Sequence, residues 1–297
     1  MSEPGAVARD QARLIFLIRS LPRFVLTAMK PQNFSKLLAL YFLLFAPGLL
    51  AQDKPAISTD DKAEQIIQRA LKGVGGDPYL QIKTVIGRGL FTEYHDGASG
   101  IPMKFVDYIS YPDKERTEFS GGGAHIVQTN FRDGGWIYDG AALTLKDQTP
   151  QQLEDFKIVT RVTVENLLRG TWRQNGAKLS YAGRREAGII GRRNETVRLT
   201  YADGFWVEYE FAADDGMPAK VLYQRKQKNP DTEEMEDMKE EDRLHKPITI
   251  DGVTSSFVID HYRNGIQTSR IAYDSVEYNK PVADSLFTKP ASIKAIK

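Results

Sequence analysis

Residues that could carry acid–base or metal chemistry are few in this chain and lie far apart. Glu208 and Glu210 share one face of a strand-like run, a placement that could mimic a paired-carboxylate site. Because Phe205, Val207 and Tyr209 occupy the opposite face, the pattern favours two glutamates on a solvated outer face. The histidines have no metal-ligand spacing and are interpreted as ordinary strand or loop residues: His95, His125, His245 and His261.

The motifs of the common catalytic sites are missing as well. The chain contains neither Gly-x-Ser-x-Gly nor His-Glu-x-x-His, and the glycines 121 to 123 lack the Lys-Ser/Thr of a phosphate-binding loop. We therefore predict no catalytic residue, no metal site and no cofactor. An enzyme acting on an envelope lipid or glycan is kept as a third hypothesis, for which the chain offers no nucleophile–base pair.

Aromatic side chains give the positive signal. A strongly curved antiparallel sheet encloses more volume than its own side chains fill, so aromatic residues on its inner face could line a ligand cavity. The pattern by itself favours the simpler alternative, in which they pack a core against helices. The aromatic residues in strand-like runs are Tyr108, Tyr111, Trp136, Tyr138, Phe205, Tyr209, Phe211 and Tyr223.

A series of antiparallel strands must position these residues. Between residues 107 and 140, alternating runs are separated by turn residues at Pro112-Asp113, at glycines 121 to 123 and at Asp133-Gly134. The alternation returns from residue 178 onward, and no βαβ rhythm competes with it. Asp-Gly or Asn-Gly pairs begin at positions 96, 133, 139, 175, 203, 215, 251 and 264, which is the turn chemistry of an antiparallel meander.

Two helical segments are predicted beside the strands. From about Asp60 to Lys72, apolar residues recur at the spacing of one buried helical stripe. Thr149 to Gln152 has the form of a capping box, which predicts one or two short helices between Gln151 and Arg169. The predicted fold class is mainly β (α+β): a strongly curved antiparallel sheet, or half-barrel, covered by an N-terminal helix and one or two short helices.

The N-terminal part is interpreted as a targeting signal. Residues 37–50 (LLALYFLLFAPGLL) form a short apolar run that follows two lysines and is too short to span a bilayer comfortably. Cleavage is expected after Ala51, with Gln52 as the alternative. Residues 1–28 could be an over-extended start, because Met29 begins a compact signal peptide by itself; an uncleaved anchor is the alternative.

This interpretation divides the chain into a signal over residues 1–51, a polar linker over 52–59 and a single domain over 60–297. Removing the signal takes away six basic and two acidic residues and leaves 34 basic against 37 acidic ones, a net charge of −3. A slightly acidic surface argues against nucleic-acid binding. With no cysteine, the exported chain has no disulfide and no acylation site of a bacterial lipoprotein. We expect a soluble periplasmic or secreted protein without a stable transmembrane span.

Several short motifs follow one another in a recognisable order. Tyr-Pro-Asp-Lys-x-Arg at residues 111–116 precedes a strand and then Asp-Gly-Gly-Trp-Ile-Tyr at residues 133–138. Asn279 and then Asp-Ser-Leu-Phe-Thr-Lys-Pro at residues 284–290 end the strands. This order resembles the periplasmic outer-membrane lipoprotein carrier family (the LolA/LolB-like, or lipoprotein-sorting-protein-like, proteins). The resemblance covers most of residues 58–290.

In that family a half-barrel of antiparallel strands is lidded by helices, and the cavity between them receives lipid acyl chains. The resemblance therefore implies a non-enzymatic carrier whose partners are the acyl chains of a lipid or lipoprotein. Ile66, Ile67 and Leu71 would form part of the lid, and the strand of Trp136 and Tyr138 part of the wall. The apolar cavity candidates are Ile66, Ile67, Leu71, Phe91, Tyr111, Trp136, Tyr138, Phe205, Val207, Tyr209 and Phe211.

Two positions of the first motif bear on how a lid would close. Arg116 is as good a candidate for the cavity mouth as for a surface ion pair. The best-studied carriers have an arginine directly before the proline, where it holds the lid closed. Tyr111 takes that place here, and a tyrosine cannot make the charged fork of an arginine.

An acidic run gives the second hypothesis. Asn229–Asp242 carries eight acids and one lysine, which predicts a solvated loop or a long hairpin tip. The chain could then be an envelope interaction module with a fully packed core, in which the loop Asp231–Asp242 engages a basic partner protein.

Overall fold

Tight turns join neighbouring strands where Asp-Gly and Asn-Gly pairs supply the left-handed backbone that such turns need. The computed structural model describes residues 59–188, 191–228 and 234–296. Both residues of three such pairs have positive φ angles, between 49° and 82°: Asp96-Gly97, Asp251-Gly252 and Asn264-Gly265. They join β1 (Thr84–His95) to β2 (Ala98–Ser99), β12 (Met235–Ile250) to β13 (Val253–Arg263), and β13 to β14 (Ile266–Tyr278).

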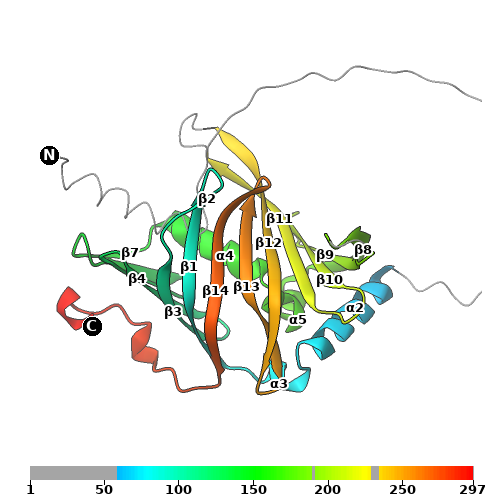
Figure 1. Cartoon of the computed structure of the whole chain (residues 1–297), viewed down its shortest axis with the longest axis horizontal. Helices are drawn as coiled ribbons and strands as arrows, with labels where there is room; N and C mark the ends of the chain where they lie inside the picture. Colours follow the sequence, from blue (N-terminus) through cyan, green and yellow to red (C-terminus); the bar gives the residue numbers. More distant parts are fainter. Residues whose placement is uncertain (1–58, 189–190, 229–233, 297) are drawn as a thin grey trace, which may run out of the picture.

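Fourteen strands of the described part form one antiparallel sheet (Figure 1). The first and last strands, β1 and β14, are neighbours in the middle of the sheet, paired from Val85 opposite Tyr278 to Glu93 opposite Ser269. The chain runs from β1 outward to the edge strand β7, crosses to the other edge at β8, and returns to β14. The other strands are β3 (Met103–Ser110), β4 (Lys114–Gly121), β5 (Ala124–Phe131), β6 (Gly134–Asp139), β7 (Thr144–Asp147), β8 (Lys178–Glu186), β9 (Arg193–Thr200), β10 (Trp206–Ala212) and β11 (Pro218–Lys228).

The crossover from β7 to β8 is helical, as predicted. The Thr149 hydroxyl accepts a hydrogen bond from the Gln152 N–H, and the Gln152 side chain accepts one from the Thr149 N–H. This capping box starts α4 (Pro150–Val162), which is followed by α5 (Val164–Leu168) and a 3-10 helix, η1 (Thr171–Asn175). Figure 1 shows α4 and α5 behind the central strands, so one face of the sheet carries the helices.

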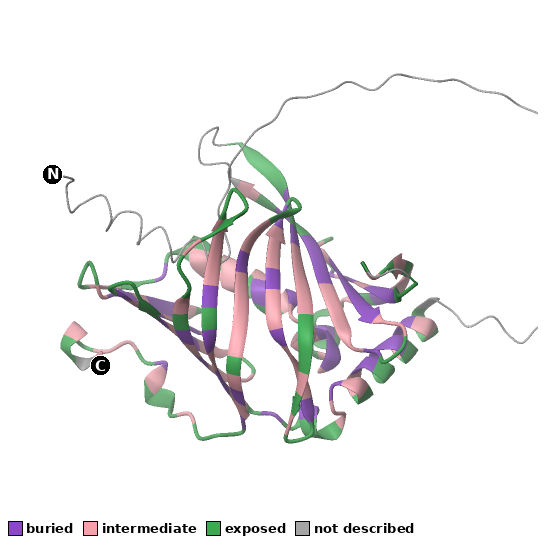
Figure 2. Ribbon diagram, viewed as in Figure 1, coloured by how far each residue is buried: buried purple, intermediate pink, exposed green. Residues whose placement is uncertain are grey.

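The predicted N-terminal helix is confirmed as α2 (Thr59–Gly73), and the short α3 (Asp77–Leu80) follows it. The apolar stripe of α2, formed by Ala63, Ile66, Ile67 and Ala70, is at most 4% exposed, and α2 packs against β8 and α5. These side chains join the largest apolar core of the molecule. Figure 2 shows that exposed residues gather at the hairpin tips, while buried ones lie within the sheet. The mainly β class with few helices is therefore confirmed.

The C-terminal segment covers part of the sheet. It contains two 3-10 helices, η2 (Asp284–Leu286) and η3 (Ile293–Ala295). Trp136 Nε1 donates a hydrogen bond of 2.9 Å to the carbonyl oxygen of Phe287, and Ile293 packs on the cluster of Val127, Trp136 and Tyr138. This segment thus fills the surface of β5 and β6 on which Trp136 lies.

The described part of the acidic run forms one arm of a long hairpin. Residues 229–233 lie outside the described part, but Met235–Asp242 begins β12 and pairs with β11. The reason is charge complementarity, because the neighbouring stretch of β11 is basic: Lys226 lies opposite Asp237, and Arg225 Nε donates to Glu240 at 3.0 Å. Of the two alternatives that the sequence predicted, the long hairpin is therefore confirmed for residues 235–242 and the solvated loop is wrong.

Glu208 and Glu210 are buried, although the sequence placed them on a solvated face. Each residue is only 2% exposed. Glu208 pairs with Arg185 and Arg198 at 2.6 Å each, and Glu210 lies 3.4 Å from Lys220 Nζ. Long basic side chains of neighbouring strands cover the carboxylates. The predicted alternation of faces in this strand is therefore confirmed, but the prediction that the face of Glu208 and Glu210 is exposed to solvent is wrong.

The predicted signal and residues 52–58 of the linker lie outside the described residues. Within residues 59–188, 191–228 and 234–296, no helix has the length and apolar character needed to cross a membrane.

Candidate functional site

A cavity of about 960 Å³ lies between the sheet and the helices α4 and α5. This volume falls in the range of small-molecule sites. Strands on both sides of the central β1–β14 pair supply its walls, and α4 and α5 supply its cover. The apolar lining includes Val85, Phe91, Phe105, Ile109, Tyr111, Phe119, Phe156, Val159, Val221, Tyr223, Ile259, Ile271, Tyr273 and Val276.

Aromatic side chains form one wall of this cavity. The rings of Phe91 and Phe119 meet edge-on with centroids 5.6 Å apart, and those of Phe105 and Tyr273 do so at 5.4 Å. Gly87 leaves room for this arrangement, because a β-carbon there would lie 2.6 Å from the Tyr273 ring. The wall is therefore held by the protein's own aromatic contacts and does not fill the cavity.

Glu165, in the first turn of α5, is one of several carboxylates that line the cavity. Glu165 is half-buried, and it belongs to the cavity lining. Burial raises the pKa of the Glu165 carboxyl, while a hydrogen bond from its own backbone N–H and the charge of Arg169 lower it less strongly. A carboxylate that desolvation makes harder to ionise therefore lies in the cavity wall.

Arg169, one helical turn further along the chain, ties the helical cover to the rest of the molecule. Its Nη1 and Nη2 donate to the carbonyl oxygens of Leu80 and Tyr79 at 3.3 and 3.2 Å. Its guanidinium carbon lies 4.2 Å from the ring centre of Tyr111 and 5.4 Å from that of Tyr79. Arg169 thus joins the end of α5 both to α3 and to the residue that follows β3.

Tyrosine hydroxyls surround the same end of the cavity. Burial raises the pKa of Tyr79, Tyr111, Tyr209 and Tyr278, and the negative charge of Glu165 raises it further in each of them. Tyr79, Tyr111 and Tyr278 line the cavity. These hydroxyls therefore stay neutral near neutral pH, and Glu165 acts on all four.

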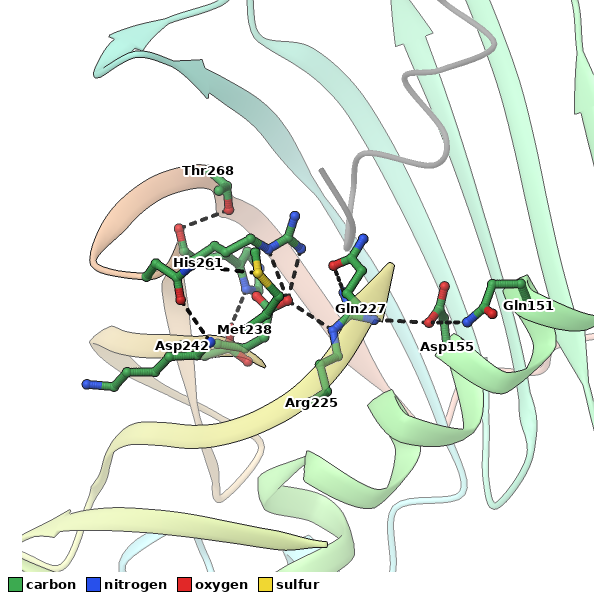
Figure 3. Close-up of polar contacts among 12 residues, drawn as sticks. Gln151, Asp155, Arg225, Gln227, Met238, Asp242, His261 and Thr268 are labelled. Atoms are coloured by element: carbon green, nitrogen blue, oxygen red, sulfur yellow. Dashed lines mark hydrogen bonds and ion pairs between the residues drawn. The ribbon is translucent and has the colours of Figure 1, made fainter. Parts of the chain in front are cut away.

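A polar network at another part of the cavity holds α4 to the sheet (Figure 3). Arg225 of β11 donates through Nη1 to Asp155 of α4 at 3.0 Å and through Nε to Glu240 of β12 at 3.0 Å. Arg263 of β13 reaches the same Glu240 oxygen at 2.9 Å. All three sheet residues are at most 9% exposed. One arginine therefore joins the helical cover to a buried set of charges on the sheet.

One histidine, His261, belongs to the cavity lining. His261 Nδ1 lies 2.5 Å from Asp242 Oδ1 beside the network, and His125 meets the ring of Tyr138. In the part of the chain that the structure describes, no group of three or more His, Cys, Asp or Glu residues is arranged to hold a metal ion.

The sequence-predicted cavity residues divide into three groups. Phe91 and Tyr111 line the cavity. Most of the others lie in or against the largest core, outside the cavity lining, because α2 packs on β8 and β9 and its side chains join that core. This second group consists of Ile66, Ile67, Leu71, Phe205, Val207, Tyr209 and Phe211.

Trp136, Tyr138 and Arg116 form the third group, and they lie on the face of the sheet that the C-terminal segment covers. Arg116 Nη1 donates to the carbonyl oxygen of Leu286 at 2.9 Å, and its guanidinium lies 5.3 Å from the Trp136 ring. Alternate residues of a strand point to opposite faces, and here both faces are covered. Aromatic character alone therefore did not reveal which of the two alternating sets of strand residues faces the cavity.

Sequence reasoning missed the charged residues of the cavity. The lining contains Glu165, Arg169 and Asp107 among other charged residues, and none of these three was a candidate. The sequence offered only their place in a helix or a strand. Arg169, just after α5, meets Tyr111, just after β3, and this long-range contact is encoded by no local pattern.

No protein-family model matches the chain, and no curated protein sequence does. Solved structures do match. A DUF1329 family protein from Desulfovibrio piger superposes with a TM-score of 0.52 at 10% identity, over 76% of this chain and 97% of that one. An assigned outer membrane lipoprotein-sorting protein domain from Vibrio parahaemolyticus gives 0.51 at 10% identity, over 77% and 97%. The resemblance inferred from the order of motifs is thereby confirmed at the level of the fold.

Proposed function

We propose that the protein is an exported, non-enzymatic carrier that shelters the acyl chains of a lipid or lipoprotein between a curved half-barrel sheet and the helices α4 and α5. The observation that carries this proposal is the cavity of about 960 Å³ with its aromatic and aliphatic walls. A packed core, which the alternative scaffold function requires, would leave no such space.

Acyl chains suit this cavity energetically. Each buried methylene contributes about 0.8 kcal/mol and needs no directional partner, so an apolar wall is sufficient for affinity. The likeness in fold to a lipoprotein-sorting domain supports the same class of ligand. Export is proposed from the apolar run at residues 37–50.

A cavity-filling variant tests the proposal. Ile259 of β13 lines the cavity, whereas Val258 next to it does not and faces the other side of the sheet. Ile259→Trp should weaken binding of a fluorescent fatty-acid probe by about tenfold or more, because it displaces roughly two methylenes. Val258→Trp is the matched control and should leave the affinity within about twofold.

Native mass spectrometry of the protein purified from its own envelope gives an independent readout. Co-purifying lipid is expected. A ligand-free mass together with no probe binding would rule out the carrier function, and so would equal probe affinity in the Ile259→Trp variant and the unaltered protein.

A further inference from the structure

The Glu165 carboxylate has unused hydrogen-bonding capacity that faces the cavity. Its own backbone N–H donates a hydrogen bond to it. Within residues 59–188, 191–228 and 234–296, no side chain forms a hydrogen bond or an ion pair with it. An ionised carboxylate has about four acceptor sites, so most of its sites lack a donor. Partial burial of an ionised acid is costly to the fold unless a ligand group compensates it.

Arg169 does not compensate Glu165 directly. Its two terminal nitrogens are directed to the carbonyl oxygens of Tyr79 and Leu80, and the ring of Tyr111 stacks on its guanidinium. No ion pair joins Arg169 to Glu165 within the described residues, although its charge acts on the carboxyl through space. Two of the N–H donors of Arg169 therefore hold the cover, its Nε is buried without a hydrogen-bond partner, and Glu165 has no direct cationic partner.

A second carboxylate adds to the negative potential at this end of the cavity. Asp107 of β3 is 9% exposed, lines the cavity and accepts a hydrogen bond of 2.7 Å from the Thr117 hydroxyl. Both Glu165 and Asp107 raise the pKa of Tyr111 after the larger effect of burial, which places Tyr111 within reach of both charges. A positively charged ligand group would be attracted to this region.

Resting on the proposed carrier function, we infer that the ligand carries a cationic amine close to its acyl chain and that Glu165 receives this group inside the cavity. The amine N–H groups would donate to the carboxylate in charge-assisted hydrogen bonds, while the chain occupies the aromatic wall of Phe91, Phe105 and Phe119. An anionic head would meet Glu165 and Asp107 unfavourably. The inference thus names the class of lipid, an amine-headed one, that the cavity selects.

Three probes with the same chain test the inference. Dodecylamine, dodecanol and dodecanoate compete with a fluorescent acyl probe for the protein at neutral pH and below the concentrations at which they aggregate. The amine should bind about tenfold more tightly than the alcohol, the size of one charge-assisted hydrogen bond, and the carboxylate should bind more weakly than both.

Variants identify the residue responsible. Glu165→Gln should remove the advantage of the amine over the alcohol and leave the alcohol's affinity within about twofold. Asp107→Asn should reduce the advantage in part and keeps the test available if Glu165→Gln folds poorly. Glu154→Gln on the exposed side of α4, outside the cavity lining, makes the same chemical change and should alter nothing.

The outcomes separate the two proposals. Binding of dodecanol without any gain for dodecylamine, or a gain that survives Glu165→Gln, would overturn the amine inference and leave the carrier function standing. Failure of all three probes to bind would overturn the carrier function and the inference with it.

Discussion

The Arg169 guanidinium lies 4.2 Å from the centre of the Tyr111 ring, so α5 and the residue after β3 are joined by a cation–π contact. The resemblance to lipoprotein carriers implied an arginine at position 111 that would reach toward the lid. Here the roles are exchanged, because the aromatic residue lies on the sheet and the arginine on the helix. The helical cover therefore has a charged contact with the segment after β3, although Tyr111 cannot itself supply the charged fork of an arginine.

A double-mutant cycle should measure this contact. Tyr111→Leu and Arg169→Met are each expected to lower the free energy of unfolding, with a coupling energy of about 1 kcal/mol because the pair is partly desolvated. Urea denaturation of the two single variants and the double variant gives their free energies of unfolding relative to the unaltered protein. The stacked pair Arg198 and Trp206 is the control, since Arg198 is 42% exposed and should couple by about 0.5 kcal/mol. A coupling near zero for Tyr111 and Arg169 would contradict the assignment.

Neutralising a carboxylate of the buried charge set should destabilise the fold much more than neutralising the carboxylate at the next position. Glu240→Gln removes the carboxylate shared by Arg225 and Arg263, and we expect a loss of about 3 kcal/mol in the free energy of unfolding. Glu241→Gln, at the next residue, breaks a pair with the half-exposed Arg243 and should cost about 1 kcal/mol or less. Equal losses in the two variants would show that the network does not behave as a buried one.

Stability should depend on pH through Glu165. Because burial raises the pKa of this carboxyl in the folded state, the folded protein holds the proton more tightly than the unfolded chain. The residue's favourable contribution is complete below its unfolded pKa and is lost as the pH rises through the folded one. Glu165→Gln should therefore gain stability relative to the unaltered protein between pH 4 and pH 8, on the order of 1 kcal/mol.

Chemical denaturation at the two pH values checks this expectation. Glu154→Gln on the exposed side of α4 should show no such gain between them. A loss of relative stability at pH 8 in Glu165→Gln would mean that the carboxylate has a stabilising partner in the fold.

The C-terminal segment should matter to the fold and not to the cavity. Phe287 is 3% exposed, and its carbonyl oxygen accepts from Trp136 on the face of the sheet opposite the cavity. Phe287→Ala should lower the free energy of unfolding by about 3 kcal/mol, and Trp136→Phe by about 1 kcal/mol. Probe affinity of the folded variants should be unchanged. Weaker probe binding by Trp136→Phe would instead place this tryptophan at the ligand, as the sequence first indicated.

Local patterns indicated the main helices and several hairpins of this protein. The apolar stripe of Ile66 and Ile67 predicted α2, the pair Thr149 and Gln152 predicted the start of α4, and Asp-Gly and Asn-Gly pairs predicted hairpins. Each of these signals acts over a few residues, through helix periodicity, capping or backbone conformation. The antiparallel class follows from them, as does the likeness in fold that the order of motifs indicated.

The sequence pattern could not decide which of the two faces of the sheet lines the cavity, because helices cover one face and the C-terminal segment covers part of the other. Trp136 and Phe91 look alike as strand aromatics, yet the C-terminal segment packs over the first, while the second lies in the cavity wall. Glu208 looked solvated until neighbouring basic side chains covered it.

By itself the sequence determined the strands, the turns, the helices and the alternation of faces, because these depend on neighbours along the chain. Only the tertiary structure decided that a hollow exists, that Glu165 and Asp107 share it, and that Arg169 meets Tyr111. The physical reason is that burial and charge pairing depend on segments far apart in the chain, whose meeting is fixed by how the helices cross the sheet.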